Sequence, residues 1–306
     1  FRRQRQMCIR DRYLGDIAVE RKLNKNFDDF FAKILLSIGY ILSFRTLRKK
    51  LGLQRAEFAA SGAAPIAPEV LKFFMSIGVP LFEAYGMTEN CAYATSNSPE
   101  NIKIGTVGIP AHGVELKLAD DGEILIRSGG VFKGYFKDDQ ATSETIDKDG
   151  WLHTGDVGIY EGDFVKIIDR KRDIIITSGG KNVSPSEIEN KIKVSPFIKE
   201  AIVIGDRRKF LSVLIGIEFD TVSNWALRKN IPHTTYRDLS EKQEVKDLVW
   251  KEISKANELT SSLEVREFRM IPKELDHEEG ELTATQKVKR NVLIDQFSDL
   301  IEEMYS

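Results

Sequence analysis

The stretch Glu83–Cys91 (EAYGMTENC) places a tyrosine, a glycine and a Thr-Glu pair within five consecutive positions. These residue types suit a bound nucleotide. Tyr85, beside Gly86, offers an aromatic face for a flat base, and Thr88 offers a hydroxyl for a phosphate oxygen. Glu89 offers a carboxylate for Mg²⁺, a hard cation that takes oxygen ligands. The same string also suits a buried strand that ends in a Thr-Glu helix cap, so other segments must decide between the two.

Small residues occupy the segment Ser61–Pro65 (SGAAP), just before a predicted helix. Gly62, Ala63 and Ala64 could bring main-chain groups close to the edge of an adenine ring without Cβ clashes. A plain strand-to-helix turn has the same composition, so this segment is uninformative by itself.

The segment His153–Asp156 (HTGD) ends in a carboxylate that can accept hydrogen bonds from both hydroxyls of a ribose. Gly155 allows the chain to turn sharply enough to aim that carboxylate. His153 is expected to be structural. A surface turn with a solvated aspartate is the alternative for this segment.

Two more segments, Asp169–Glu189 (DRKRDIIITSGGKNVSPSEIE) and Glu281–Arg290 (ELTATQKVKR), complete an ordered set of five. The set resembles that of adenylate-forming enzymes, the superfamily of acyl-CoA synthetases, luciferases and peptide-synthetase adenylation domains. Its spacing is most similar to that of long-chain fatty-acid–CoA ligases. The resemblance implies an α/β plus α+β protein. Residues 14–170 would be the C-terminal part of a large AMP-binding domain, joined by a hinge to a small mobile α+β domain at 171–306.

The resemblance also implies a reaction. ATP, with Mg²⁺, would activate a long-chain fatty acid as acyl-AMP, and CoA would then take the acyl group, with release of AMP and pyrophosphate. Lys287 would carry the first step by reaching the acyl carboxylate and the α-phosphate, and Arg170 would be a second ribose or phosphate contact. Fixed cations aimed at developing charge are usually the largest catalytic contribution. Gln286 replaces the glycine of commoner relatives, and Lys289 and Arg290 extend a basic run that could be a solvated face.

For the second step, relatives swing the small domain about the residue two positions after the ribose arginine, which is Arg172 here. Lys287 would then withdraw and a channel for the pantetheine arm of CoA would form. Large closures of this kind commonly limit turnover. The positions that would line this channel are Ser178, Gly179, Gly180 and Lys181.

One family element does not occur in the sequence: the phosphate loop T-S-G-T-T-G-x-P-K, which binds triphosphate through backbone N–H groups and a lysine. In relatives it precedes the SGAAP segment, so we expect a C-terminal piece that binds ATP poorly. Two alternatives stay open. One is a non-catalytic nucleotide- or CoA-binding fragment, and the other is a fatty acyl-AMP ligase with a different acceptor.

Composition narrows the class of protein. The 306 residues are 42% hydrophobic and 30% charged, with a net charge of −2, which is ordinary for a globular protein and gives no bias toward nucleic acid. Two cysteines, Cys8 and Cys91, favour a reducing, cytoplasmic setting.

The apolar stretch Phe30–Phe44 is too short for a membrane span of about 20 apolar residues. We expect a buried amphipathic helix there, with an interfacial helix and peripheral membrane contact as the alternative. Nothing marks an oligomeric state.

Local patterns predict the elements that position these segments. Residues 1–13 carry five arginines and a string that resembles translated adapter sequence, so a non-native or disordered leader is expected. A helix should begin at Pro68, and period-2 alternation predicts a β-rich region from about residue 105 to 169. The segment DRKRD should join two strands, and a final helix is predicted over Lys287–Met304.

Overall fold

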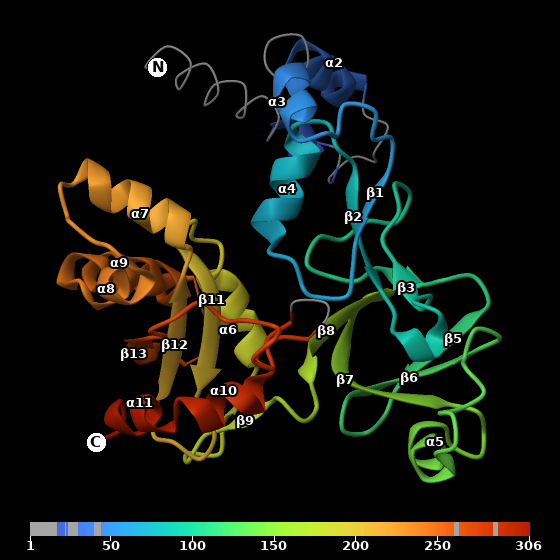
Figure 1. Cartoon of the computed structure of the whole chain (residues 1–306). Coiled ribbons are helices and arrows are strands. Elements are labelled where there is room, and N and C mark those ends of the chain that lie inside the picture. Colours follow the sequence, from blue (N-terminus) through green and yellow to red (C-terminus); the bar gives the residue numbers. More distant parts are fainter. Residues whose placement is uncertain (1–16, 22, 24–29, 40–43, 260–262, 284–286) are drawn as a thin grey trace. The chain divides into compact units, whose positions relative to one another are not determined.

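The computed structural model describes residues 17–21, 23, 30–39, 44–259, 263–283 and 287–306 (Figure 1). The leader expected at residues 1–13 lies outside these ranges. The chain divides into two compact units, Phe1–Lys171 and Arg172–Ser306. The sequence placed the boundary between residues 170 and 171.

A sheet of four short strands, in the order β1-β2-β3-β4, forms one part of the first unit. Its strands and helices are β1 (Ala59–Ser61), α4 (Pro68–Ser76), β2 (Leu81–Tyr85), the short helix η2 (Thr88–Asn90), β3 (Thr95–Ser96) and β4 (Ile109–Pro110). β1 and β2 are parallel, and α4 is their crossover helix, which begins at Pro68 as predicted. Parallel strands end at the same edge of a sheet, so the loops after β1 and β2 emerge at one edge.

A second, antiparallel sheet completes the first unit and confirms the predicted β-rich region. Its strands β5 (Val114–Leu118), β6 (Glu123–Ser128), β7 (Leu152–Glu161) and β8 (Phe164–Arg170) pair in chain order. The helix α5 (Asp139–Thr145), which the sequence did not reveal, lies in the connection from β6 to β7. Ile124 and Leu152 belong to the buried core of this sheet, and Tyr85 of β2 packs into the same core. Tyr85 therefore joins the two sheets.

The helices α2 (Phe30–Gly39) and α3 (Arg45–Lys50) precede the first sheet. The prediction of a buried helix over Phe30–Phe44 is wrong for Phe30, which is 76% exposed, and for Phe31, which is 56% exposed. Leu36 instead packs against a core cluster that includes the buried Phe44. The buried residues of α2 are instead the small ones, Ala32 and Gly39. No helix among the described residues is long and apolar enough to cross a membrane.

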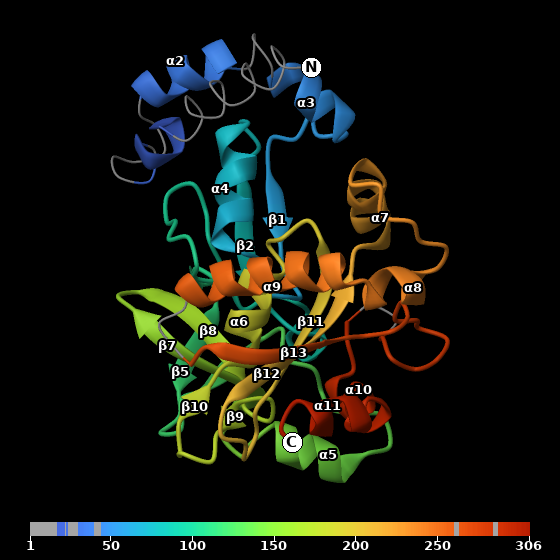
Figure 2. The ribbon, with the colours of Figure 1, turned by 90° about the vertical axis from the view of Figure 1, so that its left-hand side faces the viewer.

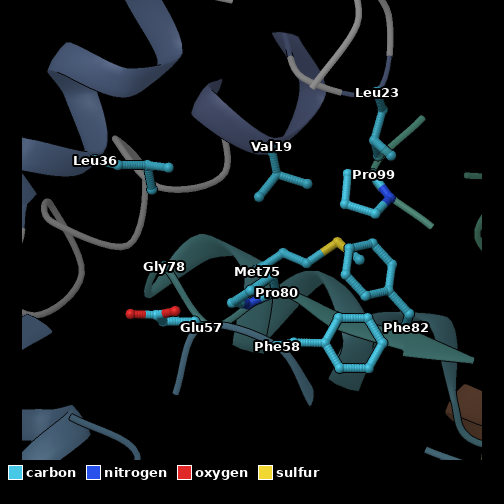
Figure 3. A pocket seen from close by; sticks show the side chains of 10 residues that line it. All are labelled: Val19, Leu23, Leu36, Glu57, Phe58, Met75, Gly78, Pro80, Phe82 and Pro99. Atoms are coloured by element: carbon cyan, nitrogen blue, oxygen red, sulfur yellow. The ribbon is translucent and has the colours of Figure 1, made fainter. Parts of the chain in front are cut away.

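An apolar pocket of about 210 Å³ lies at the amino ends of β1 and β2 (Figure 3). Phe58 directly precedes β1 and Pro80 directly precedes β2, and both line it. The other lining residues are Val19, Leu23, Leu36, Glu57, Met75, Gly78, Phe82 and Pro99. The pocket is therefore distinct from the sheet edge at which the SGAAP and YGMTE segments follow their strands.

The second unit is a three-stranded sheet, β11-β12-β13, with helices on both faces (Figure 2). Its elements are β9 (Ile175–Ile176), β10 (Asn182–Val183), α6 (Pro185–Ile192), β11 (Ile198–Ile204), β12 (Leu211–Ile217), α7 (Phe219–Arg228), α8 (Tyr236–Glu241), α9 (Gln243–Glu258), β13 (Val265–Met270), α10 (Arg290–Gln296) and α11 (Ser298–Glu303). Side chains of β11 alternate between two cores: Val203 packs with residues of α6 to α9, and Ile202 packs with residues of α10 and α11. This confirms the predicted α+β class. The sequence did not reveal β13, because half of its VREFRM residues are charged.

The helix predicted over Lys287–Met304 begins later and is broken into two. α10 starts at Arg290, and α11 starts after Phe297. Before α10, Leu282 and Val288 form an isolated antiparallel bridge. The Lys287 N–H donates to the Thr283 hydroxyl at 3.0 Å, and the Lys287 carbonyl accepts from the Thr283 N–H at 2.7 Å. Thr283 thus occupies the Lys287 carbonyl, which in a helix would accept the N–H four residues later.

Candidate functional site

The loops after β1 and β2 contain glycines that approach neighbouring backbone closely. A Cβ on Gly62 would lie 3.1 Å from the Ala84 carbonyl oxygen, and one on Gly86 would lie 2.2 Å from the Ala92 carbonyl carbon. The second distance is impossible without a backbone shift. The loop after β2 therefore requires its glycine, and the loop after β1 has little room for a side chain at Gly62.

Three residues of these loops have a left-handed backbone although they are not glycine. The φ angles are +66° at Ala63, +58° at Cys91 and +55° at Ala92. Such a conformation costs a residue with a Cβ about 1 kcal/mol or more, and it is concentrated at functional sites. One strained residue, Ala63, lies in the segment that the sequence assigned to adenine, and the other two directly follow the YGMTE segment.

Asp156, on β7, is the centre of a polar network built from three of the predicted segments. The Tyr85 hydroxyl donates to Asp156 Oδ2 at 2.6 Å. Arg170 lies opposite Asp156 in the β7–β8 ladder, with its Nε 3.7 Å from Asp156 Oδ1. Burial and the Asp156 carboxylate raise the pKa of the Tyr85 hydroxyl, so it stays protonated and donates. The structure therefore brings Tyr85, Asp156 and Arg170 together.

Glu89 is held by a partner that the sequence did not reveal. The Tyr135 hydroxyl donates to Glu89 Oε1 at 2.7 Å, which raises the pKa of Tyr135. Within the part of the chain that the structure describes, no cluster of three His, Cys, Asp or Glu side chains could hold a metal by itself. A single carboxylate fits Mg²⁺, which commonly takes its other ligands from water and substrate phosphates. The predicted role of Glu89 is therefore compatible with its surroundings.

Glu123, the first residue of β6, is a buried carboxylate that the sequence analysis missed. It accepts the Gly155 N–H at 2.9 Å and lies 3.2 Å from Lys171 Nζ and 3.5 Å from His153 Nδ1. Burial alone would raise the pKa of Glu123, but the Gly155 N–H and the Lys171 ammonium hold it below its ordinary value. One signal was available in the sequence, since Glu123 begins an apolar strand and shares its face with Leu125, which is also buried.

Two buried polar atoms flank the YGMTE segment without a hydrogen-bond partner. They are Oε2 of Glu83, which is 9% exposed, and Nδ2 of Asn90, which is 0% exposed. The other amide atom of Asn90, Oδ1, accepts the Met87 N–H at 2.9 Å. An unpaired buried polar group costs about 1–3 kcal/mol. Both groups therefore lower the stability of the fold beside this segment.

We expect Glu83 to destabilise the protein as the pH rises from about 4.5 to about 7. Burial raises the pKa of this carboxyl from 4.5 to about 7, despite the Gly105 and Ile66 N–H groups. The folded state therefore binds the proton more tightly, and the free energy of unfolding should fall by about 3 kcal/mol over that interval. Urea unfolding across this pH range measures it. Glu83→Gln should remove the fall, and Glu69→Gln, at an exposed position on α4, should keep it. If the free energy of unfolding of Glu83→Gln falls with pH as steeply as that of the wild type, Glu83 is not the cause of the fall.

In the second unit, β9 and β10 form a hairpin, with Ile176 opposite Asn182. The predicted CoA-channel residues, Ser178, Gly179, Gly180 and Lys181, lie exposed at its tip. Arg172 is the first residue of this unit, and its side chain is 76% exposed. The roles proposed for these residues stay predictions.

The basic run after Gln286 separates into different environments, although Gln286 itself lies outside the described residues. The Arg290 guanidinium donates to the Val203 carbonyl at 2.9 Å and to Glu189 Oε1 at 2.6 Å. Arg290 is thereby committed to the fold of the unit, and Lys289 is exposed at the start of α10. Thr283 holds the backbone of Lys287. Because the Arg290 guanidinium is engaged in these contacts, Lys287 stays the candidate for the predicted catalytic cation.

Comparisons with known proteins identify the family of the chain. The model of the AMP-binding enzyme family matches residues 24–136, and the model of the AMP-binding enzyme C-terminal domain matches residues 172–306. A long-chain-fatty-acid–CoA ligase of Mycobacterium bovis is 37% identical over 268 residues, which are 87% of this chain and 44% of that protein. A long-chain-fatty-acid–CoA ligase of Gallus gallus is 32% identical over 290 residues, or 87% of this chain and 38% of that protein. The chain thus spans less than half the length of these relatives.

Solved structures share the fold. The A domain of a carboxylic acid reductase from Segniliparus rugosus, in complex with AMP and a carboxylic acid, has a TM-score of 0.67 and 22% identity over 96% of this chain and 46% of that one. ATP-bound MatB from Rhodopseudomonas palustris has a TM-score of 0.60 and 24% identity over 86% of this chain and 50% of that one. At these identities the similarity concerns the fold alone.

Proposed function

The chain belongs to the AMP-binding enzyme family, and on that premise we propose that it is part of an ATP-dependent long-chain fatty-acid–CoA ligase. The substrates would be a fatty acid, ATP and CoA, and the products acyl-CoA, AMP and pyrophosphate. The relatives named as long-chain-fatty-acid–CoA ligases support this choice within the family.

One observation carries the nucleotide part of the proposal: the contact of Tyr85 and Arg170 with Asp156. Asp156 would accept the ribose hydroxyls, since each carboxylate oxygen can accept more than one hydrogen bond. Tyr85 and Arg170 would hold the carboxylate in place while it does so. This role differs from those that the sequence predicted, an adenine-stacking face for Tyr85 and a ribose or phosphate contact for Arg170, and the burial of Tyr85 supports the change. Gly62, Ala63 and Ala64 would meet the adenine edge, since their loop emerges at the same sheet edge as Tyr85.

The first reaction step would form a bond between a fatty-acid carboxylate oxygen and the α-phosphorus, and pyrophosphate would leave. Thr88 would donate to an α-phosphate oxygen, and Glu89 would hold Mg²⁺, which neutralises phosphate charge when bound. Lys287 would add its ammonium charge to the acyl carboxylate and the α-phosphate. Fixed charges of this kind stabilise the transition state without reorganisation at the moment of reaction.

The second step would form a bond between the CoA sulfur and the acyl carbon, and AMP would leave. Arg172 would be the pivot that withdraws Lys287 and presents the Ser178–Lys181 loop to CoA. The exposure of Arg172 at the boundary of the units supports that role. We also propose a cytoplasmic location with peripheral membrane contact, to which the exposed Phe30 and Phe31 of α2 would contribute.

Palmitate-dependent ATP–pyrophosphate exchange tests the proposed reaction. We expect exchange above a Lys287→Ala control in a version that carries the family's phosphate loop, and much weaker exchange in this chain, whose sequence lacks that motif. A loop-bearing version without exchange would refute the adenylating function. One that exchanges pyrophosphate yet never forms acyl-CoA would favour an acyl-AMP ligase with another acceptor.

A non-catalytic role is the second candidate, and the missing phosphate-loop motif is the observation that favours it. The chain would then bind AMP or CoA without turnover. Strong exchange by the chain itself, relative to Lys287→Ala, would exclude this candidate.

A further inference from the structure

Lys171, the last residue of the first unit, is fixed by its side chain and its backbone. Its Nζ lies 2.5 Å from Asp121 Oδ2 and 3.2 Å from Glu123 Oε2. Its N–H donates to the Gly155 carbonyl at 2.8 Å. Arg172 differs, because it is exposed and its Nε lies 3.9 Å from the carboxylate of its own neighbour, Asp173. The anchored part of the chain therefore ends at Lys171.

Glu123 contacts both this anchor and the backbone that aims Asp156. Its Oε2 faces Lys171, and its Oε1 accepts the Gly155 N–H at 2.9 Å. Gly155 lies inside β7, where the register of β6 and β7 shifts, and its φ of +70° bends the strand directly before Asp156; we call this bend the Gly155 turn, and the hydrogen bond from Glu123 holds it. The Glu123 side chain is only 9% exposed, and the Lys171 ammonium and the Gly155 N–H compensate its charge. A buried carboxylate depends strongly on such partners.

We propose that Glu123 is a positioning residue that couples nucleotide binding at Asp156 to the mobility of the connector at Lys171–Arg172. This inference rests on the proposed function, because it takes Asp156 as the ribose contact and Arg172 as the pivot. A bound ribose would fix the Gly155 turn and keep Glu123 aligned on Lys171. Release of the nucleotide would loosen the turn and, through Glu123, the anchor of the connector.

Asp121 provides a matched control because it contacts the same lysine without contacting the Gly155 turn. Its side chain is 51% exposed, whereas that of Glu123 is buried. Glu123→Gln keeps the shape and an acceptor but removes the charge that holds Lys171. Lys171→Gln removes the anchor and leaves Glu123 on the turn.

Hydrogen exchange of the whole chain, read by mass spectrometry with and without AMP, tests the coupling. Without AMP, Glu123→Gln should speed exchange about tenfold at both the Gly155 turn and Lys171, as expected for a weakened charge-assisted hydrogen bond. Lys171→Gln and Asp121→Asn should speed it at the connector alone. Saturating AMP should slow exchange at both places in the wild type, and at the turn alone in Glu123→Gln.

Wild-type exchange at the connector of Glu123→Gln would overturn the proposal, and so would full protection of that connector by AMP. Faster exchange of β6 itself in Glu123→Gln would mean that this substitution loosens the sheet, and Lys171→Gln would then provide the test. In Lys171→Gln, AMP should slow exchange at the Gly155 turn but not at the connector. If AMP does not slow hydrogen exchange at the Gly155 turn of the wild type, the proposed nucleotide site is refuted. The comparison without AMP would still show whether Glu123 holds the connector.

Discussion

Replacing Lys287 by alanine should lower palmitate-dependent adenylation by about 10²–10³-fold, the usual cost of removing one fixed group that stabilises transition-state charge. Thioester formation from supplied palmitoyl-AMP and CoA should be nearly unchanged, because Lys287 is proposed to be withdrawn in that step. Both half-reactions can be measured separately in any version of the protein that exchanges pyrophosphate.

Lys289 is the matched control for this experiment. It lies two residues away, carries the same charge and is exposed. Lys289→Ala should therefore retain adenylation. Equal loss of both half-reactions in Lys287→Ala would contradict the withdrawal of Lys287, and a larger loss in Lys289→Ala would move the catalytic role to that residue.

Asp156→Asn should weaken AMP binding by about 10²-fold, because hydrogen bonds to a charged acceptor contribute about 1.5–3 kcal/mol each. The amide would also present a donor toward the Tyr85 hydroxyl, which donates to Asp156 at 2.6 Å. Calorimetric titration of this chain with AMP gives the affinity. Asp163→Asn, at an exposed turn between β7 and β8, should bind AMP as the wild type does.

The sugar itself provides a second test of Asp156. The wild type should bind AMP far better than 2′,3′-dideoxy-AMP, whereas Asp156→Asn should bind the two similarly. If the variant still prefers AMP by the wild-type factor, Asp156 does not read the ribose hydroxyls.

Much of the first unit could be predicted, because local patterns determine it. Pro68 begins α4 as expected, and alternation in β5 and β6 gave the antiparallel sheet. The order of the motifs then predicted that residues from β2, β7 and β8 would share one site. Tyr85, Asp156 and Arg170 do lie in contact, although their roles toward a ligand stay predictions.

The features that escaped prediction depend on tertiary contacts. Glu123 and Tyr135 matter because of what the fold places beside them, namely Gly155 and Glu89, which lie 32 and 46 residues away along the chain. The last helix was placed too early because apolar spacing cannot show that Thr283 binds the backbone of Lys287. Helix propensity is a weak preference that such tertiary contacts override.

Photolabelling of this chain with 2-azido-AMP most directly tests the central claim, that the loops after β1 and β2 and Asp156 form one nucleotide site. Mass spectrometry of the labelled peptides should place the adenine adduct within residues 61–65 or 83–89. Excess AMP should abolish the label, and Asp156→Asn should reduce it strongly. A label elsewhere, or one that AMP does not displace, would contradict the account.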